Sequence, residues 1–237
     1  MADEVPGIDA KHPPSAIVDP EGPLMLRAPR ITDALAVYEA KIESLAALRQ
    51  FMAWAHGPQS VEQDYQRMSG AVGAFWRGDD FVFMMCDPAD EARVLGCIGL
   101  HRRAMNPRAI EVGYWVRTGA SGSGICTRAA RMLVVVAVEH MGFVRVQCGY
   151  DVGNAASERV IEKVGFRAEG DLRGYYATGD DAMRADGWIS RGINRMCALD
   201  PSEARAQPWY AATRDRLVVH DWLGRVAAPM ASVTPAR

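Results

Sequence analysis

The chain has 237 residues, of which 49% are hydrophobic, and its formal net charge is −2, so it is long and apolar enough to fold around a substantial core. The near-neutral charge and an isoelectric point of about 6.2 exclude the basic field that attracts nucleic acids or membrane surfaces. Five scattered cysteines without a CxxC pair predict neither a disulfide framework nor a zinc site, and no metal is expected.

The N-terminal residues are proline-rich and lack the charged start and apolar run of a secretory signal, and no apolar stretch reaches the about 18 residues of a spanning helix. We therefore expect a cytoplasmic protein with an irregular arm at residues 1–22. A helix carrying Leu35, Tyr38 and Ile42 at helical spacing should follow a first strand, and a second helix should run through Leu45, Leu48 and Met52. The next elements expected are a helix over 60–76 and strands over 81–86, 94–100 and 110–117.

The second half alternates helices and strands. The pattern predicts a helix over 125–141, a strand over 144–150, a helix over 154–164 closed by Gly165, and extended chain from Phe166. Residues 203–237 contain one further possible helix, around 210–223, before a loose tail. This order indicates an α/β (α+β) fold, in which a mixed sheet contains one internal crossover unit.

A small-residue loop over residues 117–127 lies between a predicted strand and a predicted helix. Such a turn directs unpaired backbone NH groups at one point, as a phosphate or pyrophosphate requires. The loop matches neither the P-loop nor the G-x-G-x-x-G fingerprint, so a simple flexible turn remains the alternative. Thr127 and Arg128 could donate to phosphate oxygens, whereas Arg131 reads more simply as part of a solvated helix face.

A second motif opens the helix over 154–164. Asn154 is placed as its N-cap and Ser157 at its third position, and a structural capping role is sufficient to explain both. Short polar side chains at a helix start beside a strand end could also hold a cofactor carbonyl or a leaving group.

Together these motifs resemble the GNAT acyltransferase superfamily, specifically its RimJ/RimL-type N-acetyltransferase branch. The resemblance covers about residues 24–202. It rests on these segments: Glu111–Val116, Ser121–Thr127, Asn154–Ser157, Glu162–Phe166, Leu26–Arg27 with Asp33, Leu48–Trp54, Val94–Leu100 and Arg195–Leu199.

The resemblance implies a mostly antiparallel sheet, splayed open between the strands near Ile110 and Val144, with acetyl-CoA in the opening. Residues 23–202 would form the acetyltransferase domain, between the arm and a C-terminal extension. The implied cofactor contacts are the backbone of Trp115, Val116 and Arg117 for the pantetheine, the loop residues Ser121, Gly122, Ser123, Gly124, Ile125, Cys126 and Thr127 for the pyrophosphate, and Asn154. Ser121 and Cys126 depart from the family pattern, which raises the alternative of weakened CoA binding.

Acetyl transfer to an amine needs a neutral amine, a held thioester carbonyl and a proton for the leaving thiolate. The resemblance implies Glu111 as the base through a water, Ser157 as the acid, and Asn154 as the residue that orients pantetheine or water. Tyr175 or Tyr176 is the competing acid. Strand alternation places Glu111 opposite the face of Ile110, Val112, Tyr114 and Val116.

The acceptor amine is expected between residues 47–54 and the segment after Phe166. A lone Trp54 reads as core and a lone His56 as surface, so neither is given a catalytic role. Three acidic residues, Asp180, Asp181 and Asp186, could attract a cationic amine or form a solvated loop tip.

The leading hypothesis is an N-acetyltransferase that acts on a peptide or protein N-terminus or on a small-molecule amine, as a monomer or homodimer. The alternatives are a non-catalytic acyl-CoA-binding protein and an interaction domain that dimerises through residues 209–222.

Overall fold

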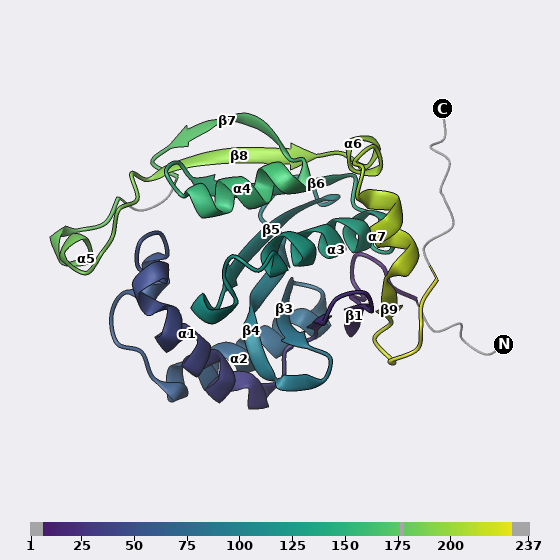
Figure 1. Cartoon of the computed structure of the whole chain (residues 1–237), viewed down its shortest axis with the longest axis horizontal. Helices are drawn as coiled ribbons and strands as arrows, with labels where there is room; N and C mark the ends of the chain where they lie inside the picture. Colours follow the sequence, from purple (N-terminus) through teal and green to yellow (C-terminus); the bar gives the residue numbers. More distant parts are fainter. Residues whose placement is uncertain (1–6, 176–177, 229–237) are drawn as a thin grey trace.

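A nine-stranded sheet runs through the molecule in the order β7-β8-β6-β5-β4-β3-β2-β1-β9 (Figure 1). The computed structural model describes residues 7–175 and 178–228. The strands are β1 (Ala16–Asp19), β2 (Leu24–Arg27), β3 (Asp80–Asp87), β4 (Asp90–His101), β5 (Ala109–Val116), β6 (Arg145–Asp151), β7 (Arg167–Arg173), β8 (Ile193–Leu199) and β9 (Val218–His220).

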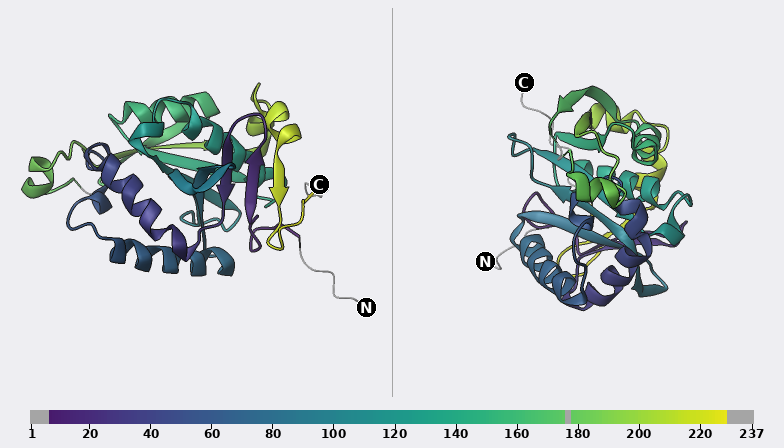
Figure 2. Two further views of the ribbon diagram at one scale, coloured as in Figure 1. Left: turned by 60° about the horizontal axis from the view of Figure 1, so that its bottom comes forward. Right: turned by 90° about the vertical axis from the view of Figure 1, so that its left-hand side faces the viewer.

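Helices cover both faces of this sheet, with α1 and α2 on one side and α3 and α4 on the other (Figures 1 and 2). The α-helices are α1 (Ala34–Leu48), α2 (Val61–Arg77), α3 (Ile125–Glu139), α4 (Ala155–Val164), α5 (Asp181–Ala185), α6 (Pro201–Arg205) and α7 (Tyr210–Arg216). The 3-10 turns are η1 (Ile31–Asp33), η2 (Ala53–Ala55) and η3 (Thr118–Ala120). This architecture confirms the predicted mixed, mostly antiparallel sheet flanked by helices.

The parallel pair of β5 and β6 is short, and this feature positions the site. Pairing runs from Ala109 opposite Arg145 to Glu111 opposite Gln147. Both strands continue beyond these partners, β5 to Val116 and β6 to Asp151, so they diverge toward their carboxyl ends. The crossover between them is α3, whose apolar residues are buried against the sheet. The splay expected between these strands is therefore present.

The helices near the N-terminus differ from the prediction in two ways. One continuous helix, α1, takes the place of the two helices expected there and ends at Leu48, before Met52. The apolar positions found at helical spacing do not form its buried face, because Leu35 is 54% exposed and Ile42 is 42% exposed. The helix instead buries a face that includes Lys41, whose Nζ lies 2.7 Å from Oδ1 of Asp64 on α2. This ion pair allows a charged residue to occupy a core position.

The two ends of the described chain join the same sheet. Residues 16–19, which the sequence predicted to be irregular, form β1 and pair with β2. The predicted C-terminal helix ends at Arg216 rather than near Leu223, and β9 follows it and pairs with β1. Strands on both sides of the domain boundaries predicted after residues 22 and 202 therefore belong to one sheet. Arg216 and Asp19, 2.8 Å apart between Nε and Oδ1, strengthen this junction.

Candidate active site

Two neighbouring cavities occupy the opening where β5 and β6 diverge. The strand pocket, about 460 Å³, lies over β4, β5 and β6, and the loop pocket, about 370 Å³, lies beside the glycine loop and α4. Six residues line both cavities: Phe51, Met52, Tyr114, Trp115, Asn154 and Ser157. Any two molecules that occupied these cavities would meet at these six residues.

The glycine loop presents backbone donors to the loop pocket. Gly122 and Gly124 have φ values of 77° and 83°, which favour glycine, and α3 begins immediately afterwards. The first intrahelical bond from this end runs from the Arg128 nitrogen to the Gly124 oxygen, at 3.0 Å. The NH groups of residues 125–127 therefore point out of the helix end, where its dipole favours an anion.

Most of the cofactor residues predicted from the sequence line this pocket. They are Trp115, Val116, Ser121, Gly122, Gly124, Ile125, Cys126, Thr127 and Asn154. The side chains of the other two are engaged elsewhere: the Ser123 hydroxyl donates to the Ala120 oxygen at 2.6 Å, and Arg117 Nε donates to Glu43 Oε2 at 2.5 Å. The cofactor roles of all these residues stay predictions.

Positive charge reaches the loop pocket from α4 rather than from the start of α3. Arg159 and Lys163 line the pocket, at an i, i+4 spacing that brings them to one helix face. Neither residue was predicted from the sequence, although their i, i+4 spacing lies within the helix expected over 154–164. Arg128 lies near Asp19, with 3.9 Å between Nε and Oδ2, and Arg131 packs over the Trp209 ring at 5.2 Å.

The Cys126 thiol is partly buried and lines the loop pocket. Burial raises its pKa to about 12. At neutral pH the side chain is therefore a thiol rather than a thiolate, and it adds no negative charge beside the backbone donors. Its presence is compatible with an anion at this helix end.

The strand pocket is floored by one face of the sheet. Alternation places Glu111, Gly113 and Trp115 of β5 on this face, as predicted. Glu111 is only 4% exposed. Its Oε1 accepts a hydrogen bond from Arg103 Nη1 and its Oε2 accepts one from Gln147 Nε2, each at 3.1 Å. The carboxylate is thus present in the pocket, with both oxygens engaged.

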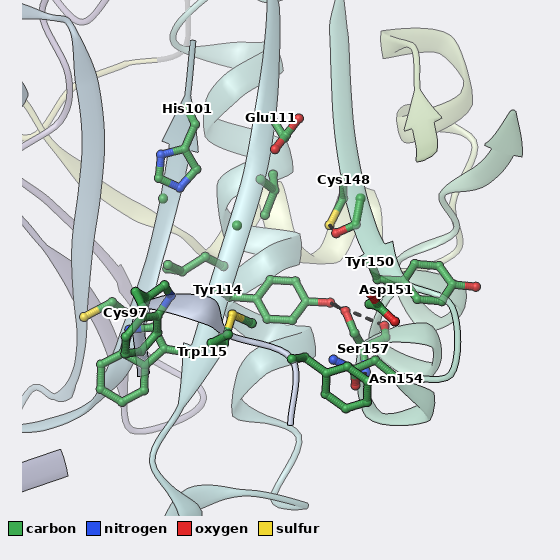
Figure 3. Close-up of a pocket in the computed structure, with 18 of the residues that line it drawn as sticks. Cys97, His101, Glu111, Tyr114, Trp115, Cys148, Tyr150, Asp151, Asn154 and Ser157 are labelled. Atoms are coloured by element: carbon green, nitrogen blue, oxygen red, sulfur yellow. Dashed lines mark hydrogen bonds between the residues drawn. The ribbon is translucent and has the colours of Figure 1, made fainter. Parts of the chain in front are cut away.

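A pair of hydroxyl groups separates the two pockets. Tyr114 extends from β5 across the splay, and its hydroxyl lies 2.8 Å from Ser157 Oγ on α4 (Figure 3). The Ser157 side chain is held there because α4 starts at Asn154, whose Oδ1 accepts a hydrogen bond from the Ser157 nitrogen at 3.1 Å. Burial raises the pKa of Tyr114 well above its ordinary value, so its hydroxyl remains a donor.

Tyr114 was assigned to the core face from the strand period. It instead reaches the site because β6 has moved away from β5 at this level. Strand alternation carries no signal of that separation, so the residue could not be identified from the sequence pattern.

Aromatic rings form the outer wall of the strand pocket. The Trp54 and Trp115 ring centroids are 6.2 Å apart, and Trp188 packs on His56 at 5.6 Å. Trp54 is 39% exposed, so its core assignment is wrong. The His56 side chain is only 8% exposed, so its surface assignment is also wrong.

The two segments predicted to frame the acceptor site differ in their relation to the strand pocket, and the acceptor site itself stays a prediction. Residues 51–54 line the strand pocket together with Trp188, which comes from the segment before β8 rather than from β7. Tyr175 lies in the turn after β7 and is 45% exposed, and Tyr176 lies outside the described residues. Both remain untested as acids.

The three acidic residues near α5 have local partners. Asp180 caps α5 by accepting from the Met183 nitrogen, Asp181 accepts from Arg184 Nη2, and Asp186 accepts from Arg49 Nη1. These contacts favour the structural alternative of a loop tip.

Neither a metal-binding cluster nor a membrane-spanning helix is present in the described residues. Across 7–175 and 178–228, no group of three or more His, Cys, Asp or Glu side chains could hold a metal ion. In the same residues no helix is both long and apolar enough to cross a bilayer.

Comparison with known proteins gives consistent matches. A family model described as "Acetyltransferase (GNAT) domain" matches residues 23–167. YdaF of Bacillus subtilis (strain 168), named as a candidate ribosomal N-acetyltransferase, is 30% identical over 155 residues, 62% of this chain and 80% of that protein. The ribosomal-protein-serine acetyltransferase of Escherichia coli (strain K12) is 26% identical over 137 residues, 58% of this chain and 75% of that protein.

A solved structure extends the similarity to the fold. RimJ of Mycobacterium smegmatis, in complex with CoA-disulfide, has a TM-score of 0.70 at 22% sequence identity, and the match covers 86% of this chain and 96% of that one.

Proposed function

The chain belongs to the GNAT acetyltransferase family and transfers an acetyl group from acetyl-CoA to an amine, and from this premise we propose that its acceptor is the N-terminus of a peptide or protein. The observation that carries this proposal is the pair of pockets that meet at Tyr114 and Ser157. Two relatives named for ribosomal acetylation support a protein acceptor, which would place the reaction in the cytoplasm.

The loop pocket suits the CoA end of the reaction. Its free NH groups at the start of α3 would bind the pyrophosphate, and Arg159 and Lys163 would add charge-assisted hydrogen bonds. The backbone of residues 115–117, beyond the β5–β6 pairing, would pair with the pantetheine. The acetyl group would then reach the junction between the pockets.

The strand pocket suits a cationic amine. Its wall contains Trp54, Trp115 and Trp188, and its floor contains the Glu111 carboxylate. Aromatic faces and carboxylates both attract an ammonium group. The pocket is open enough for the first residue of a chain whose remainder extends outside.

At the junction, the Ser157 hydroxyl is proposed to protonate the departing CoA sulfur and to recover a proton from the new amide nitrogen through Tyr114. Asn154 would fix Ser157 by capping α4. Glu111 is proposed to orient a water, because each carboxylate oxygen accepts one hydrogen bond from the protein and can accept another from a water.

The test combines binding and turnover. Isothermal titration calorimetry with acetyl-CoA should show binding, and its absence would contradict the family function for this chain and point to the Ser121 and Cys126 departures. Peptides with free N-termini should release CoA thiol and gain an acetyl mass, whereas matched peptides with blocked N-termini and one lysine should not. Acetylation of the lysine alone would overturn the N-terminal proposal.

A small-molecule amine panel, assayed by thiol release, provides the remaining comparison. Faster turnover of a free amine than of every N-terminal peptide would replace the proposed acceptor class with a small-molecule one.

A further inference from the structure

A histidine and a carboxylate face each other on the floor of the strand pocket. His101 ends β4 and lies directly opposite Asp80 of β3 in the sheet register. Its Nδ1 is 2.6 Å from Asp80 Oδ1. A carboxylate at this distance fixes the imidazole in the tautomer with the proton on Nδ1.

Two glycines provide the space in which the ring lies. Gly99 of β4 and Gly113 of β5 are register partners on the pocket face. A Cβ added to Gly99 would lie 2.8 Å from His101 Nε2, and one added to Gly113 would lie 3.0 Å from the same atom. His101 Nε2 therefore lies over this glycine pair, one pocket-face position along the strands from the level of Glu111.

The free nitrogen faces the cavity rather than the protein interior. His101 lines the strand pocket, and its side chain is 17% exposed, compared with 5% for Glu111. The carboxylate oxygens of Glu111 are engaged by Arg103 and Gln147. Of these two proton acceptors, His101 is the more exposed at the pocket surface, whereas each Glu111 oxygen already accepts a hydrogen bond.

We propose that His101, oriented by Asp80, accepts the proton that the acceptor ammonium must lose before it attacks acetyl-CoA. This inference rests on the proposed acetyl transfer in the strand pocket and names a residue that neither the sequence motifs nor the comparisons assign. Transfer occurs directly or through one water, which Glu111 is positioned to orient.

The proton balance of the reaction is complete with these groups. The ammonium gives one proton to His101 Nε2, and the neutral nitrogen then forms a bond to the acetyl carbonyl carbon. The carbon–sulfur bond breaks, and the sulfur takes a proton from Ser157 while the amide nitrogen returns its second proton to the hydroxyl pair. His101 finally releases its proton to solvent, which leaves an amide and free CoA thiol.

The charged groups nearest His101 come from two strands and one loop. Asp80 on β3 contacts the ring, Glu111 on β5 lies opposite it in the register, and Arg103 after β4 pairs with Glu111. The other titratable groups lining the pocket are Cys97, Tyr114, Cys148, Tyr150 and Asp151.

Steady-state kinetics with an N-terminal peptide test the proposal. We expect His101→Gln to lower kcat by about 10²-fold or more and to remove the acid limb of the pH–rate profile, because general base catalysis contributes about 10²–10⁴-fold. Asp80→Asn should lower kcat less. The matched control is His12→Gln, since His12 Nδ1 also pairs with an aspartate, Asp9, at 3.0 Å but lies outside both pockets.

A rate for His101→Gln within about threefold of wild type, with the acid limb retained, would overturn the inference. If Glu111→Gln removed the acid limb instead, the proton acceptor would be Glu111. Calorimetry with acetyl-CoA must show unchanged binding in each variant, so that a folding defect is excluded.

A second measurement needs no acceptor. Nitrogen-15 NMR of labelled histidines, assigned by the signal that His101→Gln removes, should show a proton on Nδ1 and a free Nε2, and Asp80→Asn should disturb this tautomer. A proton on Nε2 in the wild type would overturn the proposal. Failure of all peptides to react would count against the proposed function, while the NMR result would still decide the state of His101.

Discussion

Removal of either hydroxyl at the junction of the pockets should slow acetyl transfer strongly. Ser157→Ala removes the group proposed to protonate the CoA sulfur, and Tyr114→Phe removes its partner at 2.8 Å. General acid–base catalysis contributes about 10²–10⁴-fold, and a thiol ionises far more readily than an alcohol, so we expect the low end, about 10²-fold in kcat. That loss corresponds to about 2.7 kcal/mol of activation free energy.

The decreases in kcat caused by Ser157→Ala and by Tyr114→Phe should not be additive. If both hydroxyls serve one proton path, the double variant will be no slower than the slower single variant, whereas independent roles would give about 10⁴-fold. Because burial raises the pKa of Tyr114, its hydroxyl stays protonated through neutral and mildly alkaline pH. Tyr114→Phe should therefore lower the rate across that range without moving the alkaline limb.

Thiol-release kinetics at saturating acetyl-CoA provide the assay, with calorimetric affinity for acetyl-CoA measured in parallel. Tyr210→Phe is the matched control, because its buried hydroxyl also donates a hydrogen bond, to Glu139 at 2.8 Å, but on α7 away from both pockets. If Ser157→Ala and Tyr114→Phe each retained a rate within threefold of the control, the assignment of the hydroxyl pair would be refuted.

Three further predictions concern stability, cofactor affinity and thiol reactivity. Asp64→Asn leaves Lys41 buried without its counter-charge, which should lower the free energy of unfolding by about 3–5 kcal/mol. Tm in a circular dichroism melt should therefore fall by at least about 6 °C. The control is Asp181→Asn, at a fully exposed side chain, and an equally small shift of Tm in both variants would contradict the prediction. Lys163→Ala should weaken acetyl-CoA binding about tenfold by calorimetry, since a charge-assisted hydrogen bond contributes about 1.5 kcal/mol; unchanged affinity would remove Lys163 from the cofactor site. Desolvation raises the pKa of the partly buried Cys126 to about 12, so iodoacetamide should leave it unmodified in the folded protein at about pH 8. Labelling as fast as in urea, seen by mass spectrometry, would contradict the raised pKa.

Features of the fold that depend on neighbouring residues could be predicted from the sequence. Ser60 and Asn154 were expected to open helices, and each side chain accepts a hydrogen bond from the nitrogen three residues later. Gly165 was expected to end a helix, and it adopts the left-handed conformation there. These signals are complete within a few residues, so no distant contact is needed to interpret them.

Features that depend on distant partners were missed. Burial of Lys41 is favourable only because Asp64 lies on another helix, and the apolar pattern alone selected the opposite face. The strand at Ala16–Asp19 is short and forms between β2 and β9, which are separated by about 190 residues of chain. An apolar pattern within a short stretch of sequence shows neither the ion pair of Lys41 with Asp64 nor the pairing of β1 with β9.

The same distinction between local and distant interactions applies to the residues of the candidate site. The glycine loop and the cap at Asn154 were predicted because their role depends on backbone geometry close in the chain. Tyr114 and His101 were missed because each acquires its chemistry across the sheet, from Ser157 on α4 and from Asp80 on β3.

The short pairing of β5 and β6 explains why these separate features form one site. A parallel pair requires a crossover, and the start of that crossover, α3, supplies the NH groups proposed to bind the pyrophosphate. Pairing stops after Glu111, so the next part of β5 is free to contact a cofactor, and Tyr114 can cross the opening to Ser157. The intact pairing of β5 with β4 on the other side keeps the His101 floor rigid. Substitutions that extended the β5–β6 ladder would therefore close both pockets together, while substitutions on β4 would affect only the acceptor side.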